Sequence, residues 1–135
     1  MSHAKLADQK TKVPRSFRLV ESIKLSKEFG YVSYGVIPED ELENKDNYVK
    51  LENWQGSIVY DDGNNFHLFS LHMKVPMEYP DRAPIIVFDS GAMESNRIKK
   101  ICTNDGHIKS EILDKIGWQT KWNLGDYMME IRKYI

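Results

Sequence analysis

The sequence predicts an α+β domain with an N-terminal helix, a four-stranded antiparallel meander and a C-terminal helix. Apolar residues recur at helical spacing in residues 13–29 and again in residues 123–135. Between these stretches, three segments alternate apolar and polar residues, and a fourth, "PIIVF", is continuously apolar. At 135 residues the chain has the size of a single domain. Helices that cover one face of an antiparallel sheet account for this order of elements.

The N-terminal helix is predicted over residues 13–29, after a polar arm. This arm, residues 1–12, holds too few apolar side chains to offset the entropy of ordering it, so we expect it to be flexible. Residues 13–135 then form the domain. Pro14 suits the first helical turn, and Gly30 is expected to end the helix.

One stripe of the predicted helix is apolar. Leu19, Val20 and Ile23 project to one side at 3.6 residues per turn, and we expect them to face the core. Phe17 projects to the edge of this stripe, so a side chain of its size needs another contact. From the helix alone, that contact is either Val13 or the arm of the same chain, or a second protein.

The predicted strands separate an inner from an outer face of the sheet, because side chains alternate along a strand. The inner set is Val32, Tyr34, Val36, Trp54, Ile58, Tyr60, Phe69, Leu71, Met73 and Val75. The outer set is Ser33, Gly35, Gln55, Ser57, Phe66, Leu68, Ser70 and His72. Leu68 is therefore an apolar residue that points outward.

Turn-forming residues separate the strands. "DDGNN" predicts a hairpin turn in which Gly63 and Asn64 are able to take positive φ, and the acidic segment "PEDELENKDN" is expected to be solvated. "YPDRAP" leads into a fourth, well-buried strand and is compatible with a cis Tyr79–Pro80 bond.

The last helix is predicted from "NLGDYMMEIRKYI". Asn123 is its expected N-cap, Asp126 lies near the positive end of the helix dipole, and three apolar residues share one face. These are Leu124, Met128 and Ile131. The long stretch between Phe88 and this helix shows no clear periodicity.

Composition argues against several classes of partner. A net charge of -1 gives no general reason to bind nucleic acid or an anionic membrane, and no apolar run approaches the roughly 20 residues needed to span a bilayer. The N-terminal residues lack the apolar segment of a secretory signal, so we expect a cytoplasmic and nuclear protein. One cysteine and four scattered histidines offer no zinc ligand pair, and no phosphate loop or nucleophile elbow occurs, so no metal or cofactor is predicted.

The single thiol, Cys102, lies five residues before His107, and this pair is the one conceivable catalytic dyad. A useful thiol nucleophile needs its pKa lowered by a base, a cation or a helix N-terminus, and Lys99 and Lys100 are near in sequence. The alternative is a reduced cysteine without a catalytic role.

Several motifs, in order, resemble the ubiquitin-conjugating enzyme (UBC) fold and its inactive branch, the ubiquitin-conjugating enzyme variants (UEVs). The motifs are "VPRSFRLVESI", "VSYG", "NWQGSI", "FSLHMKV", "YPDRAPIIVF" and "KWN". Active members place a His-Pro-Asn triplet before a cysteine in a pattern like Gly-x-Ile-Cys. Here the equivalent segment is "GHIK", so Lys109 stands at the cysteine position, and His-Pro-Asn does not occur. The resemblance therefore implies a protein without catalytic residues.

The resemblance implies a role in polyubiquitin chain synthesis as one subunit of a heterodimer. By position, Val13, Arg15 and Phe17 match the contacts to an active conjugating enzyme. A second set, Ser33, Gln55, Ser57 and Leu68, matches the surface that binds acceptor ubiquitin noncovalently. The product would be the non-degradative chain of DNA damage tolerance and signalling, and a RING-type ligase is a further expected partner.

Two other readings of the resemblance stay open. One is a UEV module of the trafficking type, which binds proline-rich peptides and ubiquitin; such modules typically sit in longer chains with coiled coils. The other is an active conjugating enzyme that uses Cys102.

Overall fold

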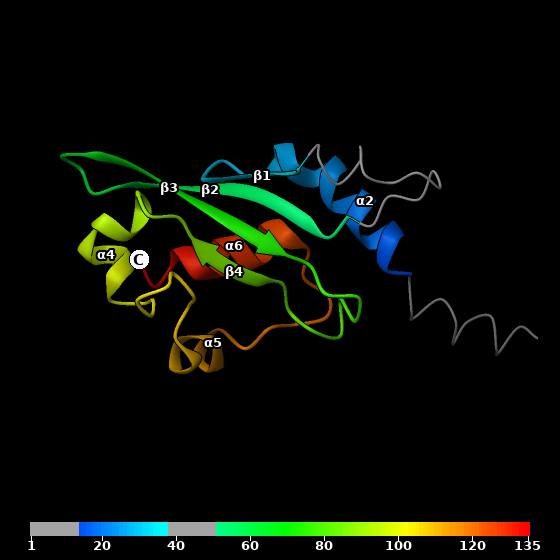
Figure 1. The fold of residues 1–135 in the computed structure, drawn as a ribbon. Coiled ribbons are helices and arrows are strands. Elements are labelled where there is room, and N and C mark those ends of the chain that lie inside the picture. The colour runs from blue at the N-terminus through cyan, green and yellow to red at the C-terminus, as the bar shows by residue number, and fades with distance from the viewer. Residues whose placement is uncertain (1–13, 38–50) are drawn as a thin grey trace, which may run out of the picture.

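The computed structural model describes residues 14–37 and 51–135. Its elements in chain order are α2 (Arg15–Leu25), η1 (Ser26–Glu28), β1 (Val32–Val36), β2 (Asn53–Asp61), β3 (Phe66–Lys74), β4 (Ile85–Phe88), η2 (Ala92–Glu94), α4 (Asn96–Lys99), α5 (Ser110–Ile116) and α6 (Leu124–Arg132). The strands form one antiparallel sheet in the order β1-β2-β3-β4, as the sequence predicts (Figure 1). The arm of residues 1–12, Val13 and the acidic segment of residues 38–47 lie outside the described residues.

The sheet has the predicted buried face. Trp54, Ile58 and Met73 are completely buried on it, and Phe69 and Leu71 nearly so. Helix α6 packs against this face at β1 and β2, and α2 packs against α6 (Figure 1). The opposite face of the sheet carries the predicted outer set and keeps exposed side chains such as Leu68.

Helix α6 begins as the sequence predicts. The Asn123 side chain accepts a hydrogen bond from the Asp126 N–H at 2.8 Å, and the Asp126 carboxylate accepts one from the Asn123 N–H at 2.9 Å. This reciprocal capping box satisfies two N–H groups that would otherwise lack partners. The predicted apolar face, Leu124, Met128 and Ile131, is completely buried.

Other local predictions are confirmed. The hairpin turn joins β2 to β3, and Gly63 takes a φ of 90°, although Asn64 does not adopt positive φ. The Tyr79–Pro80 peptide bond is cis.

Two predictions need correction, and the stretch without clear periodicity acquires structure. Helix α2 ends at Leu25 and a 3-10 turn follows, so Gly30, which is not in the left-handed region, does not end it. Strand β4 is buried on one face only, because Ile86 and Phe88 point inward while Ile85 is exposed. The stretch after Phe88 contains three short helical segments, η2, α4 and α5. Helices this short depend on tertiary contacts and leave little periodic signal.

Candidate functional surfaces

Helix α2 presents an apolar stripe to solvent. Phe17 is 65% exposed, and Val20 and Ile23 are each 42% exposed. The expectation that Val20 and Ile23 face the core is therefore wrong, although Leu19 is completely buried. Ser22, not Ile23, shares the buried side with Leu19, and the Tyr34 hydroxyl donates a 2.6 Å hydrogen bond to the Ser22 carbonyl. The spacing of Phe17, Val20 and Ile23 by three residues is the sequence signal for this second apolar face.

Arg15 is held inside the domain. Its guanidinium donates to the Pro76 and Val75 carbonyls, each at 2.9 Å, and to the Leu51 carbonyl at 3.3 Å. These bonds tie the start of α2 to the segment that follows β3. Arg15 thus positions the helix that carries Phe17, whereas Val13, the third residue of the predicted partner surface, lies outside the described residues.

The four predicted acceptor residues lie together on the outer sheet face. Ser33 of β1 is opposite Ser57 of β2, and Gln55 and Ser57 point the same way along β2. Leu68 of β3 is 59% exposed. Strand pairing therefore unites residues that are up to 35 positions apart in the chain.

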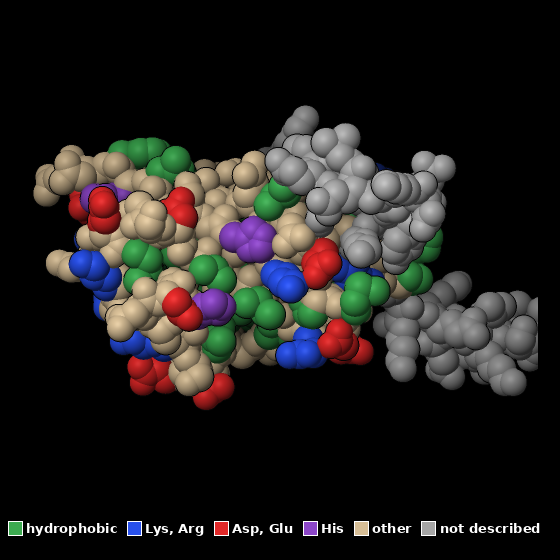
Figure 2. Space-filling model, viewed as in Figure 1, with side chains coloured by type: hydrophobic (Ala, Val, Ile, Leu, Met, Phe, Trp, Pro, Cys, Tyr) green, Lys and Arg blue, Asp and Glu red, His purple; other side chains and the backbone are tan. Residues whose placement is uncertain are grey.

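This outer face is slightly hollowed. An open depression of about 760 Å³ spans β1 to β4, and its outward side chains include Ser33, Gln55, Ser57, Ser70 and His72. Figure 2 shows this region as mostly uncharged, with a histidine near the middle of the view. Small polar side chains allow another protein to approach the sheet closely without burying unpaired charges.

The segment "GHIK" lies beside the edge of β4. Gly106 has a φ of 88°, and a Cβ atom at this position would lie 2.4 Å from the Phe88 carbonyl oxygen, so only glycine fits. The Phe88 N–H donates to the Gly106 carbonyl at 2.9 Å, and His107 forms an isolated bridge with Val87. Lys109 follows as the half-buried N-cap residue of α5.

Cys102 is buried in the same loop. It pairs with Ile108 in an isolated bridge, and the Lys109 N–H donates to the Ile101 carbonyl at 2.9 Å. Burial raises the pKa of the Cys102 thiol from 9.0 to about 11, although Lys109 acts in the opposite direction. A catalytic thiol requires the opposite shift.

His107, the other member of the conceivable dyad, has a different partner. Its Nδ1 lies 3.0 Å from the Asp105 carboxylate at the surface. Hydrogen bonds from the Thr103 hydroxyl, and also from the His107 N–H and ring, lower the pKa of Asp105 to about 2. The ring is therefore oriented by an exposed loop carboxylate.

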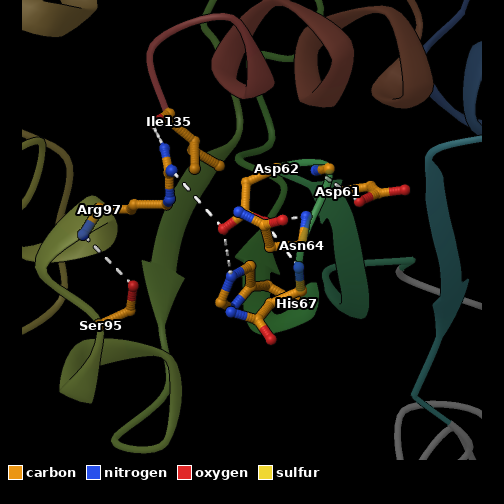
Figure 3. A network of polar contacts seen from close by, with 9 residues as sticks. Asp61, Asp62, Asn64, His67, Ser95, Arg97 and Ile135 are labelled. Atoms are coloured by element: carbon orange, nitrogen blue, oxygen red, sulfur yellow. Dashed lines mark hydrogen bonds and ion pairs between the residues drawn. The ribbon is translucent and has the colours of Figure 1, made fainter.

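A polar network holds the tip of the β2–β3 hairpin (Figure 3). The Asp62 carboxylate accepts hydrogen bonds from the Asn64 and Asn65 N–H groups at 2.9 and 2.7 Å, and lies 3.3 Å from His67 Nε2. Arg97 of α4 lies 3.9 Å from the same carboxylate. Local sequence patterns do not predict this network, because its members come from separate elements.

Over residues 14–37 and 51–135, no helix has the length and apolarity needed to cross a bilayer. The same residues contain no group of three histidine, cysteine, aspartate or glutamate side chains placed to hold a metal ion.

Comparisons with known proteins identify the fold. No family model matches the chain, and no curated protein matches its sequence. Solved structures do match: human ubiquitin-conjugating enzyme E2 G1 aligns over 91% of this chain and 96% of that chain, with a TM-score of 0.63 and 18% sequence identity. This chain has the ubiquitin-conjugating enzyme fold.

The ubiquitin-conjugating enzyme fold confirms the predicted fold class and the order of its elements. Within the described part of this UBC domain, the loops after β4 carry both Cys102 and Lys109, and the sheet and α2 carry the two exposed surfaces.

Proposed function

We propose that this chain is a catalytically inactive ubiquitin-conjugating enzyme variant. It pairs with an active conjugating enzyme and positions acceptor ubiquitin for synthesis of a non-degradative polyubiquitin chain. The burial of Cys102 carries this proposal: the only thiol of the chain is nearly inaccessible and has a raised pKa. Such a thiol is a poor acceptor for ubiquitin in a thioester exchange.

The two exposed surfaces support the proposal, because one suits contact with the active enzyme and the other suits contact with ubiquitin. The α2 stripe offers Phe17, Val20 and Ile23 to an active enzyme, and Arg15 fixes the helix that carries them. The outer sheet face offers Ser33, Gln55, Ser57 and Leu68 to ubiquitin. An apolar stripe on a helix suits a lasting subunit contact, whereas a small polar face suits a weak, exchangeable one.

The mechanism is one of orientation. The active enzyme carries donor ubiquitin as a thioester, and this chain holds a second ubiquitin so that one of its lysine amines meets that thioester. The amine nitrogen forms a bond to the thioester carbonyl carbon, the carbon–sulfur bond breaks, and the sulfur leaves as the thiolate of the active enzyme while the amine proton passes to solvent. Holding both reactants removes much of the entropic barrier to the bimolecular step. This chain supplies no proton transfer or covalent bond.

Reconstitution tests the proposal. Candidate active conjugating enzymes are incubated with activating enzyme, ATP and ubiquitin, with and without this chain, and the chain linkage is determined by mass spectrometry. We expect one linkage to appear only when both subunits are present, and Cys102→Ser to leave its yield unchanged. A reducible ubiquitin adduct on the parent chain that is lost in Cys102→Ser would assign catalysis to Cys102 and overturn the proposal.

A second pocket favours an alternative function, that of a peptide-binding module. A pocket of about 310 Å³ lies between β4 and α5, lined by Pro84, Ile85, Leu113 and Trp118 among others. An aromatic and aliphatic groove of this kind suits a short extended peptide, as in a trafficking-type UEV module. Binding of proline-rich peptides without any stimulation of chain synthesis would favour that function.

We also propose the cytoplasm and nucleus as the sites of action, with DNA damage tolerance as the process served and a RING-type ligase as a further partner.

A further inference from the structure

The hairpin end of the outer sheet face is apolar. Phe66 is 71% exposed, and Leu68 follows two residues later on the same side of β3. Val59 of β2 lies directly opposite Leu68 and projects to the same face. Figure 2 shows hydrophobic side chains grouped over the β2–β3 hairpin. Only Leu68 of these three residues belongs to the predicted acceptor surface.

This apolar patch of Val59, Phe66 and Leu68 continues the polar acceptor surface without a gap. Ser57 precedes Val59 by two residues on the same face of β2, and Ser57 is opposite Ser70, which in turn follows Leu68 by two residues on β3. The outer face therefore changes from polar to apolar along the strands. A protein that docks on Ser57 reaches the patch with little added distance, because alternate residues of a strand are about 7 Å apart.

The hairpin is held in place from the buried side. Arg97 lies 3.9 Å from the Asp62 carboxylate, donates to the Ile135 carbonyl at 3.4 Å and stacks on the Tyr60 ring at 4.4 Å. His67 stacks on Phe69 with a centroid distance of 5.7 Å. Figure 3 shows that the contacts of Arg97 and His67 converge on Asp62 at the tip. A binding surface that is held by its own domain loses less conformational entropy when a partner binds.

Negative charge borders the patch. Asp61 is opposite Phe66, and hydrogen bonds from the Asn65 and Asn64 N–H groups and from His67 lower the pKa of Asp62 to about 2. The Asp62 carboxylate is therefore charged at neutral pH, but it lies 3.9 Å from Arg97 on the inner side, so Asp61 is the carboxylate that borders the patch. The patch is complementary to an apolar surface that is bordered by cationic side chains.

We infer that Val59, Phe66 and Leu68 form the apolar half of the acceptor-ubiquitin site, so that ubiquitin spans the sheet from Ser33 to the hairpin. This inference rests on the proposed function, and it assigns Phe66 and Val59 as contacts that determine acceptor affinity. Three side chains provide far less than the roughly 800 Å² that each partner buries in a stable complex, which disfavours a permanent dimer of this chain. A weak complex is what repeated exchange of acceptor ubiquitin requires.

The test is direct binding, measured without the active enzyme. Unlabelled monoubiquitin is titrated into isotopically labelled chain, and amide chemical shifts give both the contact surface and the Kd. We expect shift changes at Val59 and Phe66 as well as at Ser57, and a Kd raised about tenfold in Phe66→Ser, the loss expected of one well-packed interface side chain. Met77→Ser, at an exposed apolar residue in the turn after β3, is the matched control and should leave the Kd within about twofold of the parent value.

The outcomes separate this inference from the proposed function. If ubiquitin binds at Ser33 and Ser57 but Phe66→Ser leaves the Kd unchanged, the inference is wrong and the proposed function stands. Absence of any ubiquitin binding overturns both. Shift changes at Phe66 that depend on protein concentration without ubiquitin would assign the patch to a second copy of the chain and overturn the inference. The side chain of Phe66 is mostly exposed, so its replacement should leave the thermal midpoint nearly unchanged.

Discussion

Replacement of Phe17 by alanine should separate pairing from folding. A phenylalanine side chain has an accessible area of about 200 Å², so a side chain that is 65% exposed offers about 130 Å² to a partner. At about 25 cal/mol per Å², complete burial of this area would contribute about 3 kcal/mol. Alanine keeps part of the contact, so we expect a loss of about 2 to 3 kcal/mol, which raises the Kd for the active enzyme about 30- to 150-fold.

Isothermal titration calorimetry against the active enzyme found by reconstitution measures this loss. Chemical denaturation of the same variant should show a free energy of unfolding within about 0.5 kcal/mol of the parent value, because Phe17 makes few contacts inside the domain. Leu113→Ala, on α5, is the matched control and should bind the active enzyme like the parent chain. A Kd that changes less than about threefold in Phe17→Ala would refute the assignment of the α2 stripe.

Four further changes test other parts of the structure. Leu68→Arg should leave pairing with the active enzyme unchanged but abolish chain synthesis, since a charge then lies on the acceptor surface; normal chain yield would remove that surface from the mechanism. Cys102 should react with iodoacetamide at pH 8 about a hundredfold more slowly in the native than in the unfolded chain, because its pKa is raised from 9.0 to about 11. The same raised pKa means that the folded state favours the protonated thiol. The contribution of Cys102 to the free energy of unfolding should therefore be lost as the pH rises from about 9 to about 11. Cys102→Ser should remove this part of the pH dependence. Asn123→Ala should lower the free energy of unfolding by about 1 kcal/mol in urea, and an unchanged midpoint would contradict the importance of the capping box. Arg15→Met should weaken pairing although Arg15 is bonded to its own domain, because α2 loses its anchor; unchanged affinity would limit Arg15 to a role in folding.

The sheet and its two faces were predictable from the sequence because strand periodicity is local. Alternation along β2 and β3 places Trp54 and Met73 inside and Gln55 and Leu68 outside, and the structure confirms all four. A shift of one residue would have exposed the whole apolar set, so the register is strongly determined. The proposed acceptor surface follows directly from this alternation.

The helices were less predictable. Helix α2 has two apolar sides, one with Leu19 and one with Phe17, Val20 and Ile23. Helical periodicity alone does not determine which side packs against the rest of the domain. The position of α6 decides it, since α2 packs against α6. Segments η2, α4 and α5 are at most seven residues long, and tertiary contacts stabilise them more than local preference does.

For Cys102 and Lys109, the sequence alone determined which chemical groups are present: one thiol, no His-Pro-Asn triplet, and a lysine within the "GHIK" segment. Only the tertiary structure decided what surrounds them. The loop after β4 folds back on itself and buries Cys102 opposite Ile108, which raises the pKa of the thiol. Likewise, the sequence determined that Arg15 is a cation, and the fold brings its guanidinium to carbonyls as many as 61 residues away. Residue chemistry and periodicity are local properties, whereas burial and hydrogen-bond partners depend on distant segments that only the folded chain brings together.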